Sequence, residues 1–185
     1  KMFREPVPTT RFGKLCLPST VTCLVEHDER NKVIEGVIRK ITQAPSTRQL
    51  LVLSDRRLHC EYLHSLFTEN SGLYMGGMKE QALALSSQKQ IIFATFSQAH
   101  EGLDIPSLDT VLLATPKSDI KQSIGRIMRE TTGKKNNPQI FDMADHWSVF
   151  FAMFAKRRRV YVDGGFHIHG ASKDAENPFK GKCII

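Results

Sequence analysis

Short apolar segments alternate with amphipathic segments along this chain, and that alternation constrains the fold more than any other feature. The clearest amphipathic segment places Val33, Ile34, Val37, Ile38 and Ile41 on one helical face. The expected strands are 21–25, 50–53, 73–75, 90–95, 110–114 and 139–141. The expected helices are 31–42, 56–67, 79–88, 97–100, 118–130 and 146–161.

The expected strands are too uniformly apolar for a sheet with one solvated face. Strands buried on both faces and separated by helices are typical of a mainly parallel sheet covered by helices on both sides. We therefore predict an α/β fold with three layers. Because ligands of such sheets bind beyond the carboxyl ends of the strands, we expect functional loops to begin at Ser54, Gly76, Thr95, Thr115 and Asp142.

Two of the expected helices allow a prediction of their buried residues. In helix 56–67, with Ser54 and Asp55 as caps, the inward residues are expected to be Leu58, Tyr62, Leu63 and Leu66. In helix 146–161, the expected core residues are Trp147, Phe150, Phe151 and Phe154.

The composition excludes several classes of protein. The 26 Lys and Arg against 19 Asp and Glu give a net charge of +7, which is too small for a polycationic tail protein. No apolar run approaches the roughly 20 residues of a membrane-spanning helix, so we expect an intracellular chain with no membrane partner. The four cysteines form no CxxC pair, and no further ligands accompany His167 and His169, so no metal site is predicted.

The segment ATFSQAHEGLDIP carries the first candidate site. Thr95 ends an expected strand, where its hydroxyl and nearby amides could meet a phosphate, and Gly102 permits a close backbone approach. The Asp104 carboxylate could accept a hydrogen bond from a ribose hydroxyl. The alternative interpretation of Asp104 is a turn residue before the rigid Pro106.

The segment QSIGRIMR carries the second candidate site. Gln122, Arg126 and Arg129 share one helical face, while isoleucines on the other face can pack on the sheet. Two guanidinium groups one turn apart can bind a polyphosphate or offset charge on a transferring phosphoryl group. Gly125 is costly in mid-helix and would be explained by a close neighbour. The alternative is two solvated arginines on an ordinary amphipathic helix.

Together and in this order, the two segments resemble motifs V and VI of superfamily 2 helicases. LLVLSDRRLHCEYLHSLF resembles motif IV, and LYMGGM resembles the strand and glycine turn that follow it. The match covers about Arg30 to Ile168 and is nearest to the DNA helicases of large cytoplasmic DNA viruses, of the poxvirus and asfarvirus type, such as African swine fever virus. It implies a second, C-terminal RecA-like lobe at 30–168, a connector with a short strand at 1–29, and a flexible tail at 169–185.

The resemblance implies a part in ATP hydrolysis for the matching residues of the two motifs. Arg126 and Arg129 would be arginine fingers toward the γ-phosphate of ATP, with Gln122 nearby. Gly102 and Asp104 would contact the ribose and phosphate side of the nucleotide.

Other matching residues are implied as contacts to the DNA backbone. They are Thr95, the turn that holds Ser54 and Arg56, and the Gly76 and Gly77 loop. The basic runs at 156–159 and 134–135 could also neutralise phosphates, or could be solvated faces.

The family's phosphate-binding P-loop and DExx carboxylates have no match here, and Asp28 and Glu29 are interpreted as a helix cap. The resemblance therefore implies half of an ATP-dependent DNA helicase, inactive alone, whose partners are DNA, ATP with Mg²⁺ held mainly by the first lobe, and that N-terminal RecA-like lobe. It also implies a cytoplasmic viral setting, such as a viral factory or virion, and a part in transcription or DNA replication. The competing hypothesis is a non-enzymatic, basic α/β domain that binds nucleic acid or protein.

Overall fold

The computed structural model describes residues 8–43, 45–101, 103–128, 136–145 and 149–169, with the side chains of 126–128 left out. Within these residues, five strands form one parallel sheet in the order β2-β3-β1-β4-β5. The strands are β1 (Leu50–Ser54), β2 (Ser71–Tyr74), β3 (Ile91–Thr95), β4 (Thr110–Leu113) and β5 (Gln139–Asp142). The predicted α/β class and parallel sheet are confirmed.

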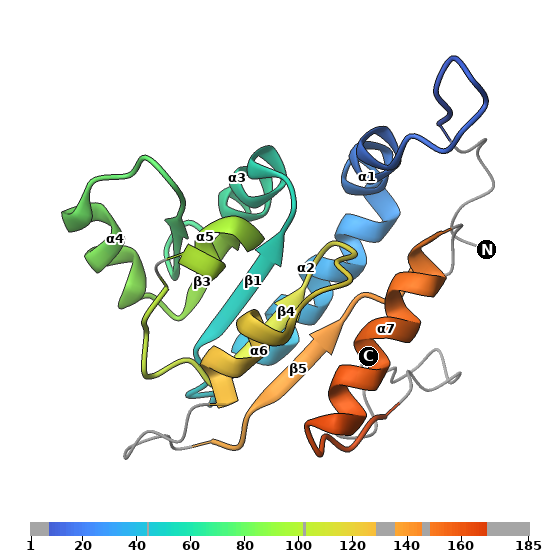
Figure 1. The fold of residues 1–185 in the computed structure, drawn as a ribbon. Coiled ribbons are helices and arrows are strands. Elements are labelled where there is room, and N and C mark those ends of the chain that lie inside the picture. Colours follow the sequence, from blue (N-terminus) through green and yellow to red (C-terminus); the bar gives the residue numbers. More distant parts are fainter. Residues whose placement is uncertain (1–7, 44, 102, 129–135, 146–148, 170–185) are drawn as a thin grey trace.

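Helices cover both faces of this sheet (Figure 1). On one face, α2 (Asp28–Thr42) and α3 (Arg57–Ser65) pack on alternate strand residues such as Val52 and Phe93. On the other, α5 (Phe96–Glu101), α6 (Lys121–Met128) and Tyr161 of α7 (Val149–Asp163) pack on the intervening residues. Two apolar cores therefore sandwich the sheet, as strands buried on both faces require.

The edge strand β2 is covered by α4 (Glu80–Ser87) at very short range. A Cβ atom added at Gly72 would lie 2.7 Å from the Cα atom of Ser86. Only glycine allows the two backbones to approach this closely.

The predicted strand 21–25 is wrong. These residues lie in α1 (Leu17–Val25), which has Pro18 in its first turn, where proline fits a helix. Val21 and Leu24 are buried against Phe150 of α7, so the apolar run is one face of a helix. No helix among the described residues is long and apolar enough to cross a bilayer.

The buried face of α3 also differs from the prediction. Leu58 and Tyr62 are exposed, whereas His59 and Cys60 are buried with Leu63. The helix can bury a histidine because His59 finds hydrogen-bond partners at both ring nitrogens. Arg56, rather than Ser54 or Asp55, is the N-cap residue.

Smaller differences concern α2 and α7. In α2, Val33 is exposed and His27 is the N-cap, with Asp28 and Glu29 in the first turn. In α7, Phe150 is fully buried but Phe151 is exposed. Trp147 lies outside the described residues, as does the predicted tail except His169.

The basic run at 156–159 is expected to be solvated or to bind phosphates, but Arg157 within it is buried. This side chain is 1% exposed and forms a bidentate ion pair with Asp142, while its three basic neighbours are exposed. Arg157 is therefore a structural residue. The other run, 134–135, lies outside the described residues.

Candidate functional site

Three of the predicted loops meet at the carboxyl edge of the sheet. Ser54 at the end of β1 pairs in register with Thr95 at the end of β3, so these two positions lie side by side. The loop after β2 lies next to them, because the Gly76 carbonyl accepts a hydrogen bond of 3.4 Å from Nη1 of Arg57. Gly77 has φ +81°, a conformation that favours glycine in this turn.

Ser54 is fully buried, so its hydroxyl organises the turn and does not face solvent. The Ser54 Oγ atom accepts a hydrogen bond from the backbone N–H of Arg56 at 3.1 Å and lies 3.0 Å from Nδ1 of His59. Nε2 of His59 lies 3.1 Å from Oδ1 of Asn31. Burial, together with the charge of Arg30, lowers the pKa of His59 to about 3, so the ring is neutral.

The guanidinium of Arg56 lies at the surface of the same turn, and its side chain is 29% exposed. Its Nη1 atom donates to Oδ2 of Asp55 at 2.9 Å, and its Nη2 atom donates to the Pro18 carbonyl at 2.8 Å. A phosphate at this position would have to compete with the carboxylate of Asp55.

Thr95 is half-buried and helps to begin α5. Its hydroxyl lies 3.1 Å from that of Ser97 and accepts a hydrogen bond from the backbone N–H of Gln98 at 3.4 Å. The hydroxyl remains at the carboxyl edge, beside the turn of Ser54 and Arg56.

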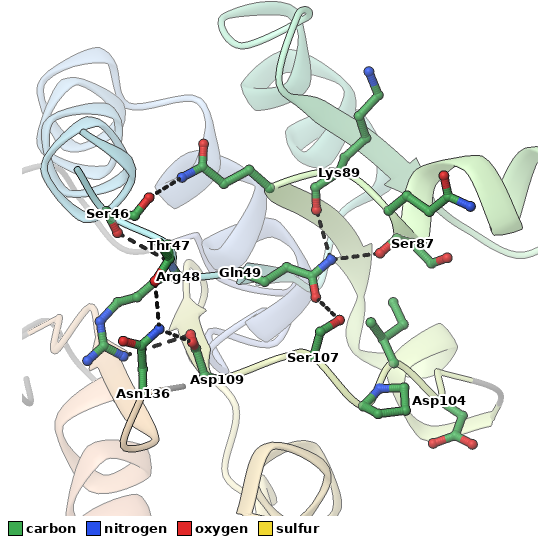
Figure 2. A pocket seen from close by; sticks show the side chains of 14 residues that line it. Ser46, Thr47, Arg48, Gln49, Ser87, Lys89, Asp104, Ser107, Asp109 and Asn136 are labelled. Atoms are coloured by element: carbon green, nitrogen blue, oxygen red, sulfur yellow. Dashed lines mark hydrogen bonds and ion pairs between the residues drawn. The ribbon is translucent and has the colours of Figure 1, made fainter. Parts of the chain in front are cut away.

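Asp104 lies near the amino ends of the strands, whereas Thr95 lies at their carboxyl ends. After β3, α5 carries the chain back across the sheet, and Asp104 lines an open pocket of about 840 Å³ beside the segments that lead into β1, β3, β4 and β5. Figure 2 shows its carboxylate at the rim of this pocket. The loop that begins at Thr95 thus starts at the carboxyl ends of the strands, as predicted, but has returned to their amino ends at Asp104, and Gly102 lies outside the described residues.

Gln49 links the segments that form this pocket (Figure 2). Its Nε2 atom donates to the carbonyls of Ser87 and Lys89 at 2.7 and 2.9 Å, and its Oε1 atom accepts from the hydroxyl of Ser107 at 2.5 Å. These hydrogen bonds connect the segment after Asp104 to the residues that precede β1 and β3.

The helix α6 leads from the carboxyl edge back along the sheet (Figure 1). Ile120 and Ile124 are buried under it and Gln122 is exposed, as the amphipathic pattern predicts. A Cβ atom added at Gly125 would meet nothing within 4 Å, so contacts of the described residues do not require this glycine. The Arg126 side chain and all of Arg129 lie outside the described residues, so their predicted positions stay predictions.

Sequence reasoning missed the contacts of the loop between β4 and α6. The Thr115 hydroxyl accepts a hydrogen bond from the backbone N–H of Asp55 at 2.8 Å, and Nζ of Lys117 lies 3.2 Å from Oδ1 of Asp55. The Lys117 carbonyl accepts from Nη1 of Arg157 at 3.0 Å. The position of Thr115 at a strand end was the available signal; the partners of this loop, Asp55 and Arg157, are at least 40 residues away in sequence.

Among the described residues, no group of three or more His, Cys, Asp and Glu side chains could hold a metal ion.

Comparison with known sequences finds viral relatives. The chain is 37% identical over 147 residues to a putative ATP-dependent RNA helicase of Acanthamoeba polyphaga mimivirus, covering 76% of this chain and 28% of the relative. It is 24% identical over 140 residues to a putative ATP-dependent RNA helicase of African swine fever virus, covering 75% and 28%. A transcript termination protein of Myxoma virus is 27% identical over 181 residues, covering 89% and 38%. No protein-family model matches the chain.

Two solved structures share the fold. UvsW superposes with a TM-score of 0.62 at 21% identity, covering 82% of this chain and 36% of that one. The C-terminal domain of the DEAD-box protein Dbp5 superposes with a TM-score of 0.61 at 13% identity, covering 81% and 87%. The chain thus matches close to the whole of a separate domain, and it spans about 28% of the mimivirus and African swine fever virus relatives.

Proposed function

The chain is a C-terminal helicase-like domain of superfamily 2, related to putative ATP-dependent RNA helicases of mimivirus and African swine fever virus and to a transcript termination protein of Myxoma virus, and from this premise we propose that it is the second motor lobe of an ATP-dependent nucleic-acid helicase or translocase. The identity to the African swine fever virus protein is 24%, below the 37% identity to the mimivirus protein. African swine fever virus is therefore not assigned as the source of this chain.

The observation that carries the proposal is the meeting of the predicted nucleic-acid contacts at one edge of the sheet. The register of Ser54 with Thr95 and the bond from Arg57 to Gly76 bring three loops together there. In this arrangement Arg56 and Thr95 contact backbone phosphates, Gly76 and Gly77 let the strand approach, and the buried Ser54 positions Arg56.

The nucleotide would bind on α6 and the segment of Asp104. Gln122 and Asp104 are both exposed, so ATP held by the first lobe can reach either side chain, Gln122 from the carboxyl ends of the strands and Asp104 from their amino ends. Arg126 and Arg129 would offset charge on the transferring phosphoryl group, and Gly102 would lie near the ribose. The first lobe would hold most of the ATP and its Mg²⁺, so this chain alone would hydrolyse little ATP.

The extent of the lobe also enters the proposal. The boundary predicted at residue 30 falls inside α2, whose Arg30 forms an ion pair of 2.8 Å with Asp145. Because α1 also packs on α7, we place the beginning of the lobe at Leu17 rather than at residue 30.

The substrate is proposed as nucleic acid, with DNA and RNA to be compared directly. The resemblance to viral DNA helicases favours DNA, whereas the mimivirus and African swine fever virus relatives are named as RNA helicases. Contacts to backbone phosphates serve either polymer, because the phosphate charge is common to both. The name of the Myxoma virus relative supports a setting in viral transcription, whereas a part in DNA replication rests on the resemblance of the sequence alone; both belong to the same proposal.

The test is ATP hydrolysis by this chain co-expressed with a P-loop lobe, measured with and without single-stranded DNA or RNA. We expect hydrolysis stimulated by nucleic acid, and we expect Arg129→Ala to reduce it about 10³-fold, as loss of an arginine finger does. The matched control is Arg39→Ala, an exposed arginine of α2 that pairs with Glu35. Full hydrolysis in Arg129→Ala would refute the finger assignment. No hydrolysis in the pair of lobes would favour a non-enzymatic interaction domain.

A further inference from the structure

The carboxylate of Asp55 lies between two cations. Its Oδ2 atom accepts a hydrogen bond from Nη1 of Arg56 at 2.9 Å, and its Oδ1 atom accepts from Nζ of Lys117 at 3.2 Å. The side chains of all three residues are about one-third exposed, at 33%, 29% and 38% for Asp55, Arg56 and Lys117. Solvent and a bound phosphate can therefore reach this cluster, and its ion pairs can exchange partners at small cost.

Lys117 belongs to a loop that is held from both sides. At the front, the Thr115 hydroxyl accepts from the backbone N–H of Asp55 at 2.8 Å. At the back, the Lys117 carbonyl accepts from the buried Arg157 at 3.0 Å. The Lys117 ammonium also lies 5.5 Å from the ring centre of Phe96, at the beginning of α5.

The same loop leads directly into α6. Asp119 accepts a hydrogen bond from the backbone N–H of Lys121 at 3.3 Å, and the fully buried Ile120 accepts from the N–H of Ile124 at 2.9 Å. Only three residues separate Lys117 from Lys121, the first residue of α6, so the two share one short hydrogen-bonded segment.

A phosphate that binds Arg56 changes the charge balance of the cluster. The guanidinium prefers a bidentate phosphate over a single contact to a carboxylate, so the phosphate displaces Asp55 from Arg56. Asp55 then has only Lys117 as a cationic partner among these three residues. The phosphate charge also repels the released carboxylate, so Asp55 turns away from Arg56 and toward Lys117, and its ion pair with Lys117 readjusts.

We infer that Asp55 is a positioning residue that couples phosphate binding at Arg56 to the position of α6 through Lys117. The inference rests on the proposed function and adds a regulatory link between its two sides. Nucleic acid at the carboxyl edge adjusts the helix that carries Gln122 and Arg126.

The experiment records backbone amide NMR signals of the 185-residue chain during titration with a single-stranded oligonucleotide, as DNA and as RNA. In the wild-type protein we expect signals of Ser54 to Arg56 and of Lys121 to Gly125 to shift with one common Kd. In Lys117→Gln and Asp55→Asn, the α6 signals should no longer respond. Asp55→Asn keeps the backbone N–H that binds Thr115, so it removes the charge without removing the turn.

Arg56→Gln is the sharpest variant because it releases Asp55 without any ligand. Its α6 signals should lie at, or toward, the positions of the oligonucleotide-bound wild type before any titration. The matched control is Lys32→Gln, which removes an exposed ion pair to Glu29 on α2 and should leave the α6 signals and their response unchanged.

The outcomes separate the inference from the proposed function. If the oligonucleotide shifts no signal at Ser54 to Arg56 while Arg56→Gln still moves α6, the nucleic-acid contact fails and the link through Asp55 stands. If Arg56→Gln leaves α6 at the free wild-type positions, or Lys117→Gln keeps the full α6 response, the link is overturned whether or not nucleic acid binds.

Discussion

Arg157 and Asp142 form a bidentate ion pair in which each side chain is only 1% exposed. The two N–O distances are 2.7 and 2.8 Å, and the hydroxyl of Tyr161 donates to the same carboxylate at 2.6 Å. Arg157 also holds the Lys117 carbonyl. One side chain of α7 thus connects the end of β5 with the loop that leads into α6.

Removing Arg157 should destabilise the domain strongly. Arg157→Met leaves the Asp142 carboxylate buried without its cation, which costs about 3–5 kcal/mol of the free energy of unfolding. Urea unfolding followed by circular dichroism measures this change. Arg158→Met is the control, since Arg158 is exposed, and it should change stability by less than about 0.5 kcal/mol. Equal stabilities of the two variants would contradict the structural assignment of Arg157.

His59 should make the domain less stable in mild acid. Its folded-state pKa is about 3, below the ordinary value of 6.5, so between these values the unfolded state binds a proton that the folded state excludes. The contribution of His59 to the free energy of unfolding is complete above pH 6.5. It decreases as the pH is lowered below 6.5, by up to about 1.4 kcal/mol per pH unit. Urea unfolding from neutral pH to about pH 5 should therefore show a smaller loss in His59→Gln than in wild type.

An exposed histidine supplies the control for that measurement. His167→Gln should keep the pH dependence of the wild type, because His167 lies at the surface. If His59→Gln lost stability with acid as steeply as the wild type, another group would have to cause the effect.

Gly72 and Gly36 should respond oppositely to alanine. A methyl group at Gly72 would lie 2.7 Å from the Ser86 backbone, so Gly72→Ala must separate β2 from α4 and costs about 1–3 kcal/mol. At the exposed Gly36 in α2, a methyl group meets nothing within 4 Å, and Gly36→Ala should stabilise by about 0.5–1 kcal/mol. Thermal unfolding of both variants measures the difference; a neutral Gly72→Ala would show that α4 does not need this close approach.

Arg56 should contribute to the salt dependence of nucleic-acid binding. If it contacts one phosphate, Arg56→Gln weakens binding and reduces the slope of log K against log salt concentration by about 1. Fluorescence anisotropy with a labelled oligonucleotide over a salt series measures the slope. Lys32→Gln should keep the wild-type slope, because Lys32 forms an exposed ion pair with Glu29 and is not one of the proposed contact residues. An unchanged slope in Arg56→Gln would remove this residue from the interface.

Elements with strong local patterns were predictable because the pattern itself is local. The uniformly apolar runs that became β1, β3 and β4 require burial on both faces, and this condition implies a parallel sheet between two helical layers. Ile120 and Ile124 likewise identified the buried face of α6 from spacing alone. The segment 21–25 failed, since a short apolar run fits either a strand or one face of a helix.

Side-chain partners were not predictable, because they come from distant parts of the chain. Arg157 looked like one residue of a basic run that was either solvated or phosphate-binding, and only the meeting of α7 with the end of β5 gives it a buried carboxylate. His59 is buried because Asn31 of α2 and Ser54 of β1 satisfy its ring nitrogens.

By itself, the sequence determined the alternation of strands and helices from α2 onward, the parallel sheet and the order of the motif segments, since each depends on residues close in sequence. The tertiary structure decided that Asp104 lies at the opposite edge from Thr95, and that Asp55 lies between Arg56 and Lys117. The physical reason is that periodicity sets which face of an element is buried. The path of the chain through α5 sets the position of Asp104, and the loop after β4 brings Lys117 to Asp55.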